Sequence, residues 1–221
     1  MSNKIIIAPS MLSCDLSNSE NESKRMISSG ADWLHMDIMD GVFVPNLTFG
    51  FPVLESIRKK VPDVHLDCHL MIVNPKKWVN QIVKTANSIS FHIEACHNQD
   101  EAIDIINQIK LINQNIKVGI ALNPDTSLVE IIKILEQKSV DYVLVMTVNP
   151  GFSGQQFYYK CLDKISSIRK NYPYLDIQVD GGINLETFKL CRERGANIFV
   201  SGSTIFKHPS PEELIKQFKT L

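Results

Sequence analysis

Short apolar runs alternate with longer segments of helical periodicity along the whole chain. Eight runs have the length and composition of buried strands: residues 4–9, 32–37, 64–72, 88–95, 116–122, 141–148, 176–181 and 197–202. The segments between them include residues 98–113, 127–137 and 160–172, whose apolar side chains repeat as in an amphipathic helix. Eight strand-then-helix units imply parallel strands and favour a closed (β/α)8 TIM barrel in the α/β class. An open doubly wound sheet stays possible, because a count of elements does not prove closure.

The chain is expected to form one catalytic barrel domain over residues 1–221. Barrels of 200–250 residues are commonly one domain, and no Pro/Gly/Ser linker, charge block or low-complexity tract divides this sequence. The last helix is expected over residues 210–221. Ser210 is its predicted N-cap, Pro211 its first helical residue and Glu213 the capping-box partner.

Composition argues against several classes of function. The net charge is −1, so binding to nucleic acid or to a membrane surface, which usually needs an excess of basic residues, is not expected. No apolar run approaches the ~18 residues of a membrane span, and residues 1–12, broken by Pro9, are too short for a signal peptide. The five cysteines show no paired spacing, which indicates reduced thiols in a cytoplasmic protein.

Polar side chains occur near the carboxyl ends of several runs, where barrels carry their chemistry. Alternation along a strand puts His35 and Asp37 on one face and Leu34 and Met36 on the other. The same parity turns Asp67 and His69 of the third run and Asp180 of the seventh run toward the barrel axis. The full set comprises Ser10 after the first run, His35 and Asp37 in the second, His69 in the third and Asp180 in the seventh.

Two imidazoles and two carboxylates at a barrel mouth could bind one divalent transition-metal ion, with His35, Asp37, His69 and Asp180 as ligands. Such a cation would compensate both carboxylates, whose burial otherwise costs several kcal/mol. The alternative is a hydrogen-bonded polar network, which is favoured for the His-x-Asp motif alone. Adding His69 and Asp180 at matching strand ends reverses that preference. Fe²⁺, Zn²⁺, Mn²⁺ and Co²⁺ all suit these ligands.

Glycine-bearing segments follow three consecutive strands, at residues 149–157, 180–183 and 201–204. Glycine lets backbone N–H groups approach an anion closely, and barrels often bind phosphate after their seventh and eighth strands. Any one glycine pair is weak evidence, because turns use glycine everywhere. The three segments together predict a phosphate-binding site.

Met39, Met71 and Met146 each fall at or just past a strand end. They are either core filler or a soft apolar collar that excludes water from the metal site. The remaining histidines receive a structural interpretation: His65, His92, His97 and His208. Of these, His92 ends a run and could help to line the pocket.

Six blocks of this sequence resemble those of one enzyme family: APSMLSCD, HMDIMDGVFVPNLTFG, DCHLMI, MTVNPGFSGQQF, VDGGI and SGSTIF. In content and order they are similar to the signature blocks of ribulose-phosphate 3-epimerase, over roughly residues 5–206. The resemblance implies a metal-dependent (β/α)8 isomerase of carbohydrate metabolism that interconverts D-ribulose 5-phosphate and D-xylulose 5-phosphate. It further implies one divalent ion per subunit and a homodimer or homohexamer.

The resemblance also implies roles for individual residues. The metal ligands fall on His35, Asp37, His69 and Asp180, and the acid/base pair on Asp37 and Asp180. The methionine collar falls on Met39, Met71 and Met146. The substrate contacts fall on Ser10, His69, Gly151, Phe152, Ser153, Gly154, Asp180, Gly181, Gly182, Gly202 and Ser203.

The chemistry fits these residues. Inversion at C3 needs one base to remove a proton from one face and an acid to deliver another to the opposite face, through a metal-stabilised enediolate. Three alternatives stay open. The first is an epimerase of a longer sugar phosphate such as D-allulose 6-phosphate, and the second is a catalytically silent sugar-phosphate-binding barrel. The third, an enzyme like orotidylate decarboxylase or hexulose-phosphate synthase, is disfavoured because those use Asp-x-Lys-x-x-Asp, and HMDIMDG has no lysine.

Overall fold

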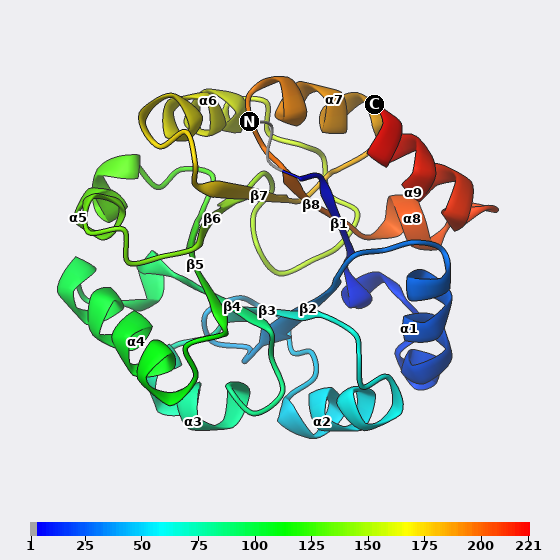
Figure 1. Cartoon of the computed structure of the whole chain (residues 1–221), viewed down its shortest axis with the longest axis horizontal. Coiled ribbons are helices and arrows are strands. Elements are labelled where there is room, and N and C mark those ends of the chain that lie inside the picture. The colour runs from blue at the N-terminus through cyan, green and yellow to red at the C-terminus, as the bar shows by residue number, and fades with distance from the viewer. Residues whose placement is uncertain (1–3) are drawn as a thin grey trace.

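The computed structural model describes residues 4–221, whose eight strands form one parallel sheet curved into a ring (Figure 1). The first three residues of the expected domain lie outside the described residues. The strands are β1 Ile6–Pro9, β2 Leu34–Met39, β3 Leu66–Met71, β4 Ser88–His92, β5 Lys117–Leu122, β6 Tyr142–Met146, β7 Asp176–Asp180 and β8 Ile198–Ser201. Neighbours pair in chain order from β2 to β8, and β8 pairs with β1.

The ring closes between β1 and β2 through a short contact. A single parallel bridge joins Ser10 to His35, and the backbone N–H groups of Asp32 and Trp33 donate to the Ile7 carbonyl at 2.9 and 3.3 Å. The Asp32 carboxylate also accepts a hydrogen bond from the Ile7 N–H at 2.9 Å. The prediction of a (β/α)8 barrel is therefore confirmed, and the open sheet is excluded.

Helices surround the ring on its outer side (Figure 1). They are α1 Ser19–Ser28, α2 Phe51–Lys60, α3 Val79–Ile82, α4 Gln99–Ile112, α5 Ile132–Glu136, α6 Cys161–Asn171, α7 Leu185–Glu193, α8 Ser203–Phe206 and α9 Pro211–Thr220. The helical pattern at residues 127–137 is only partly α-helical, because it starts with a 3-10 turn over Leu128–Ile131. None of the helices in the described part of the chain is long and apolar enough to cross a membrane.

Helix α9 begins at Pro211 as expected, but the predicted capping box does not form. The Ser210 side chain makes no cap hydrogen bond. Its backbone N–H, the donor that Glu213 would bind in a capping box, instead donates to Nδ1 of His208 at 3.1 Å. The prediction for Glu213 is wrong because a nearby imidazole satisfies that donor first.

The alternation of side chains along the strands is as expected. Leu34, Met36 and Ile38 pack in the main core between the sheet and the helices. His35 and Asp37 face the barrel axis and are almost completely buried there. Strand β2 starts two residues later than expected and ends at Met39, but this shift leaves the parity unchanged. The barrel interior therefore carries a polar group just below its mouth.

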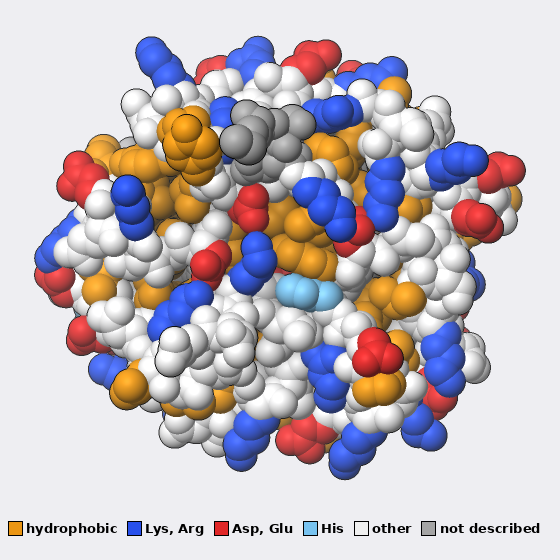
Figure 2. All heavy atoms as spheres, viewed as in Figure 1, with side chains coloured by type: hydrophobic (Ala, Val, Ile, Leu, Met, Phe, Trp, Pro, Cys, Tyr) orange, Lys and Arg blue, Asp and Glu red, His pale blue; other side chains and the backbone are white. Residues whose placement is uncertain are grey.

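The face seen in Figure 2 carries acidic and basic side chains scattered among polar and apolar ones. Neither sign of charge forms a continuous patch on this face. This distribution agrees with the net charge of −1.

Candidate active site

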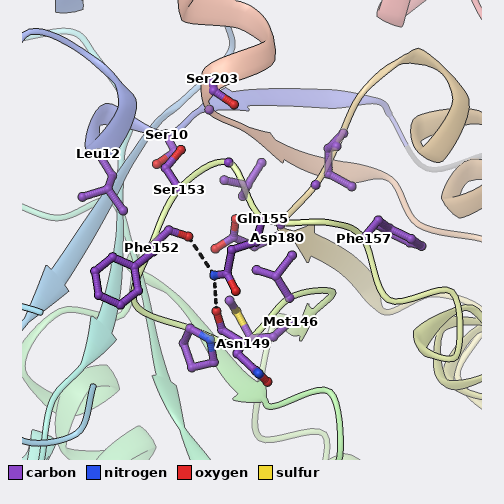
Figure 3. Close-up of a pocket in the computed structure, with 18 of the residues that line it drawn as sticks. Ser10, Leu12, Met146, Asn149, Phe152, Ser153, Gln155, Phe157, Asp180 and Ser203 are labelled. Atoms are coloured by element: carbon purple, nitrogen blue, oxygen red, sulfur yellow. Dashed lines mark hydrogen bonds between the residues drawn. The ribbon is translucent and has the colours of Figure 1, made fainter. Parts of the chain in front are cut away.

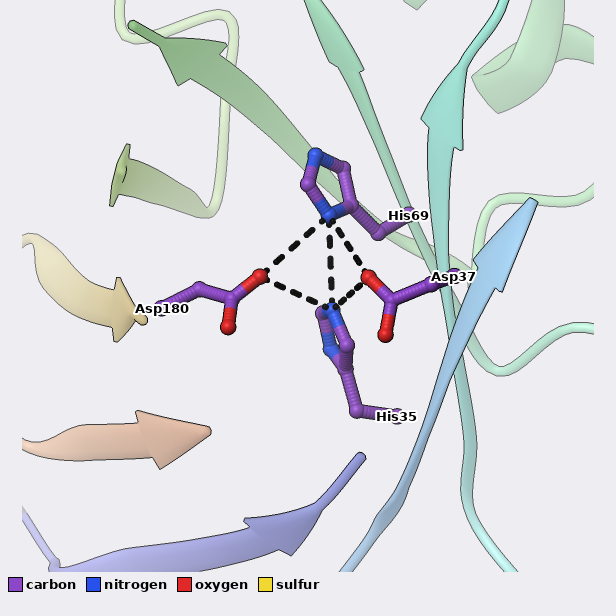
Figure 4. A group of neighbouring side chains, drawn as sticks. All are labelled: His35, Asp37, His69 and Asp180. Atoms are coloured by element: carbon purple, nitrogen blue, oxygen red, sulfur yellow. Dashed lines mark hydrogen bonds and ion pairs between the residues drawn. The ribbon is translucent and has the colours of Figure 1, made fainter. Parts of the chain in front are cut away.

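Four side chains from three strands converge near the carboxyl ends of the barrel strands (Figure 4). Nε2 of His35 lies 3.3 Å from Oδ1 of Asp37, 3.6 Å from Oδ2 of Asp180 and 3.4 Å from Nδ1 of His69. Nδ1 of His69 lies 3.3 and 3.6 Å from the same two carboxylate oxygens. The two aspartates lie on opposite sides of the imidazole pair (Figure 4). The sequence predicted all four residues.

Strand register explains this convergence. His35 of β2 pairs with Asp67 of β3, and Asp37 pairs with His69. Paired residues of neighbouring strands point to the same face of a sheet, so all four of these side chains enter the barrel. Asp180 is the last residue of β7 and approaches the group from another part of the ring.

The four ligand atoms have the spacing that a small cation needs. Tetrahedral coordination with bonds of about 2.0–2.1 Å places ligand atoms roughly 3.3–3.4 Å apart. The five separations given above range from 3.3 to 3.6 Å, and all four atoms lie within 4.8 Å of one another. Two imidazole nitrogens and two carboxylate oxygens therefore fit a divalent transition metal.

The electrostatics of the group also favour a positive charge at its centre. Burial alone would lower the pKa of His35, but Asp37, Asp180 and Asp67 together raise it well above its usual value. Burial would raise the pKa of Asp37, yet His35 and His69 lower it below its usual range. The pKa of His69 is raised by Asp180 and Asp37 against the effect of burial. In the absence of a cation, protons on the imidazoles balance the carboxylates.

Asp67 contacts the ring nitrogen of His35 that faces away from the other three ligands, and so fixes the orientation of the ring. Its Oδ2 lies 2.8 Å from Nδ1 of His35 and accepts from Nε2 of Gln178 at 2.5 Å. Its Oδ1 accepts from Ser88 Oγ at 2.6 Å and from the Tyr142 hydroxyl at 3.1 Å. Although burial raises it, these donors hold the pKa of Asp67 at about 2. Because the carboxylate can only accept, Nδ1 of His35 carries a proton, and Nε2 is the nitrogen whose lone pair a cation would bind.

Ser10 makes a contact that the sequence reasoning did not anticipate. Its hydroxyl donates to Oδ2 of Asp37 at 2.6 Å, so it contacts the oxygen that does not face the histidines. Ser10 also lines the pocket above the cluster, as expected for a substrate contact. Ser10 and Asp37 therefore both border the cavity.

A cavity of about 590 Å³ lies above the cluster (Figure 3). Among the residues predicted for the site, those lining this cavity are Ser10, Asp37, Met39, Met71, Met146, Gly151, Phe152, Ser153, Gly154, Asp180, Gly181, Gly182, Gly202 and Ser203. His35 and His69 do not line it, because they lie fully buried beneath. Lining residues that the sequence reasoning missed include Leu12, Asn149, Gln155 and Thr204. Asn149, Gln155 and Thr204 lie within the glycine-bearing segments, and Leu12 lies two residues after Ser10; these positions were the available signal.

The segment between β6 and α6 passes over the centre of the ring (Figure 1). Nδ2 of Asn46 donates to the Gly151 carbonyl at 2.7 Å, and the hydroxyls of Ser13 and Ser153 lie 2.6 Å apart. Within the segment, Nε2 of Gln155 donates to the carbonyls of Asn149 and Phe152 (Figure 3). Contacts from the loops after β1 and β2 therefore hold this segment above the cavity.

The glycines at the cavity wall are required by backbone geometry as well as by space. Gly181 and Gly182 have φ angles of +117° and +66°, a region that L side chains rarely adopt. At Gly202, whose φ is ordinary, an added Cβ would lie 2.3 Å from the Ser13 hydroxyl. The backbone here lies close to its neighbours and borders the cavity directly.

The three methionines are the last residues of β2, β3 and β6. Met39 pairs with Met71 across the sheet, and Met146 pairs with Asp180. All three are almost fully buried and also line the cavity. They therefore pack in the barrel and lie beside the ligand group, which fits both interpretations of their role.

The chain matches known proteins over nearly its full length. Residues 6–206 match the model of the Ribulose-phosphate 3 epimerase family. The chain belongs to this family. It is 46% identical over 215 residues to the cytoplasmic isoform of ribulose-phosphate 3-epimerase from Oryza sativa subsp. japonica, covering 96% of this chain and 92% of the relative. It is 39% identical over 221 residues to ribulose-phosphate 3-epimerase from Bacillus subtilis, covering 97% of this chain and 98% of the relative.

Membership of the ribulose-phosphate 3-epimerase family makes the chain an isomerase. Solved structures share its fold at low identity. KGPDC from Streptococcus mutans aligns with a TM-score of 0.73 at 15% identity, over 97% of this chain and 95% of that one. A 3-hexulose-6-phosphate synthase aligns with a TM-score of 0.69 at 14% identity, over 99% of each chain. These likenesses support the barrel fold.

Proposed function

We propose that this member of the epimerase family interconverts D-ribulose 5-phosphate and D-xylulose 5-phosphate, with Asp37 and Asp180 exchanging protons at C3. The observation that carries the proposal is the placement of the two carboxylates. They lie on opposite sides of one imidazole pair and both border one cavity. Two such groups can reach opposite faces of a carbon held between them, as inversion requires.

His35, Asp37, His69 and Asp180 would hold one divalent cation, for which Fe²⁺, Zn²⁺, Mn²⁺ and Co²⁺ are candidates. When bound, the cation supplies Lewis acidity that stabilises negative charge on the substrate oxygens at C2 and C3. Each histidine contributes one nitrogen and each aspartate one oxygen to the group. The second oxygen of each aspartate is then available for proton transfer.

In the forward direction one aspartate takes the C3 proton from ribulose 5-phosphate, which leaves an enediolate. The other aspartate, which enters the step protonated, then delivers its proton to the opposite face of C3, and the first aspartate keeps the proton that it removed. Ser10 donates to Oδ2 of Asp37 and so keeps this oxygen directed toward the cavity. Met39, Met71 and Met146 provide an apolar wall that excludes water from the proton transfers.

The phosphate would bind between the glycine segments, at Gly181, Gly182, Gly202 and Ser203. Among the described residues that line the cavity there is no lysine or arginine. Backbone N–H groups and hydroxyls would therefore provide the contacts to the phosphate, as in other barrels that bind phosphate after the seventh and eighth strands. The remaining segment, with Gly151, Phe152, Ser153 and Gly154, would cover the substrate.

An epimerase of D-allulose 6-phosphate is the second candidate, since the same cluster would serve a longer sugar. Parallel kinetics on five- and six-carbon ketose phosphates test the choice. We expect a higher kcat/KM for ribulose 5-phosphate, and a preference for the six-carbon sugar would contradict it. The name of the rice relative supports a cytoplasmic location.

Metal uptake is expected to release protons at pH 7. The raised pKa of His35 means that the metal-free protein holds a proton there, and a cation needs that lone pair. Lowering the pH should therefore weaken metal binding, and raising it should strengthen binding. Calorimetry of Zn²⁺ binding in two buffers of different ionisation enthalpy measures the release. Equal heats in both buffers would show that no proton leaves.

Gly202→Val is expected to raise KM for ribulose 5-phosphate about 10-fold or more, because the side chain enters the proposed phosphate site. Steady-state kinetics measure the change. The added side chain would also press on the Ser13 hydroxyl, so the matched control is the double variant Ser13→Ala/Gly202→Val. Recovery of the parent KM in the double variant would mean that crowding by Ser13, and not loss of the phosphate site, causes the effect.

A further inference from the structure

The two histidines of the ligand group present different ring nitrogens to it. His35 presents Nε2, whereas His69 presents Nδ1. A neutral imidazole binds a cation through the nitrogen that lacks a proton, and its other nitrogen carries the proton. His35 has the Asp67 carboxylate to hold that proton on Nδ1. His69 has no carboxylate on its far nitrogen, so its proton must be held in another way.

The far nitrogen of His69 faces a third histidine. Its Nε2 lies 2.8 Å from Nε2 of His92, and the two ring planes are inclined by only 22°. Both rings are completely buried. One of these nitrogens must donate and the other must accept. The state of the other nitrogen of His92 decides which one donates.

That nitrogen faces a carboxylate. Nδ1 of His92 lies 3.0 Å from Oε2 of Glu94. The other oxygen of Glu94, Oε1, accepts from the Asn123 N–H at 2.7 Å and from the Thr126 hydroxyl. Because the carboxylate only accepts, Nδ1 of His92 carries a proton and its Nε2 has a lone pair. His69 must then donate from Nε2, which leaves Nδ1 free for a cation.

We propose that Glu94, acting through His92, is a positioning residue that fixes the tautomer of His69 and makes its Nδ1 a metal ligand. This inference rests on the proposed metal centre, but it concerns residues outside the ligand group. The essential feature is the direction of two hydrogen bonds, in which Nε2 of His69 donates to Nε2 of His92 and Nδ1 of His92 donates to Glu94. A network with a purely structural role would need only that each polar group has a partner, whatever the direction.

Glu94→Gln tests the direction with a side chain of nearly the same shape. The amide oxygen is expected to keep the two donors, Asn123 and Thr126, so the NH₂ group must face Nδ1 of His92. The chain of hydrogen bonds then reverses, and His92 donates to Nε2 of His69. The proton of His69 moves to Nδ1 and blocks the cation. We expect the affinity for Zn²⁺, measured by competition with a chromophoric chelator, to fall about 10–100-fold.

Two further variants separate this effect from a structural one. In a His92→Phe background the chain is already broken, so adding Glu94→Gln should cause no further loss of Zn²⁺ affinity. Glu101→Gln is the matched control, because Glu101 makes the same carboxylate–imidazole contact with the exposed His97, at 2.7 Å. It should bind Zn²⁺ like the parent. Thermal unfolding of each metal-free variant reports on folding separately.

Nitrogen-15 NMR of the histidine rings in the Zn²⁺-loaded parent gives a second readout. We expect the proton of His69 on Nε2 and the proton of His92 on Nδ1. If the parent binds no stoichiometric Zn²⁺, the proposed metal centre itself is wrong. If the parent binds Zn²⁺ and Glu94→Gln binds it equally tightly, the metal centre stands and the positioning role is overturned. Additive losses in the double variant would also overturn it.

Discussion

Replacing Asp37 or Asp180 with Asn is expected to lower kcat for epimerisation at least ~10²-fold. The amide keeps the shape of the side chain and removes the base. Both variants are measured with a coupled assay for xylulose 5-phosphate. Asp176→Asn is the matched control, because Asp176 lies at the opposite end of β7 from Asp180 and does not line the cavity. It should keep most of the activity of the parent.

The two variants should differ in the proton exchange that remains. Each retains one base, which can still reach C3 from its own side. In deuterated water we expect one variant to exchange the C3 proton only of ribulose 5-phosphate and the other only of xylulose 5-phosphate. Epimerisation by both variants near the rate of the parent would mean that groups other than these aspartates carry the protons.

Removing the phosphate from the substrate should have an effect of similar size. Two or three charge-assisted hydrogen bonds are worth about 1.5–3 kcal/mol each, and about 1.4 kcal/mol corresponds to a tenfold change. We therefore expect kcat/KM for unphosphorylated ribulose to be lower than for ribulose 5-phosphate by about 10²-fold or more.

Inorganic phosphate provides the control for this comparison. If the glycine segments bind the phosphate, inorganic phosphate should inhibit the phosphorylated substrate competitively, and Gly202→Val should weaken that inhibition. Comparable kcat/KM values for the two sugars would contradict the assignment of a phosphate site to Gly181, Gly182, Gly202 and Ser203.

The positions of the four ligands could be predicted from the sequence because two simple rules apply to them. Strand alternation determines which side chains face the barrel axis, and parallel strands bring their carboxyl ends to one mouth. His35, Asp37, His69 and Asp180 all follow from these rules, and their distances agree with them. The ends of β2 were predicted two residues too early, but an even shift does not change the direction of a side chain.

The supporting contacts of the ligands could not be predicted in the same way. Asp67 was expected to face the axis, but its contact with His35 depends on the register between β2 and β3. His92 and Glu94 have the same spacing as His35 and Asp37, which was a usable signal. Their roles depend on ring orientation and on donors from the loop after β5, and neither is encoded locally.

One local contact and one contact between neighbouring strands illustrate what else the sequence did not predict. The sequence pattern at residues 210–213 matches a capping box, but His208 reaches the donor first. Within β5, position 119 has no room for a side chain, because an added Cβ on Gly119 would lie 2.4 Å from the ring of Tyr142 on the neighbouring strand. This contact arises only when β5 and β6 pair.

The central claim is that this protein is a metal-dependent epimerase of ribulose 5-phosphate, and one assay tests it most directly. The purified protein is incubated with D-ribulose 5-phosphate, and formation of D-xylulose 5-phosphate is followed with a coupling enzyme, before and after removal of divalent metal by a chelator. We expect conversion by the protein as isolated or after loading with Fe²⁺, Zn²⁺, Mn²⁺ or Co²⁺. Conversion should be lost after chelation and restored by adding one of these ions. Absence of conversion with every ion, or full conversion by the metal-free protein, would contradict the claim.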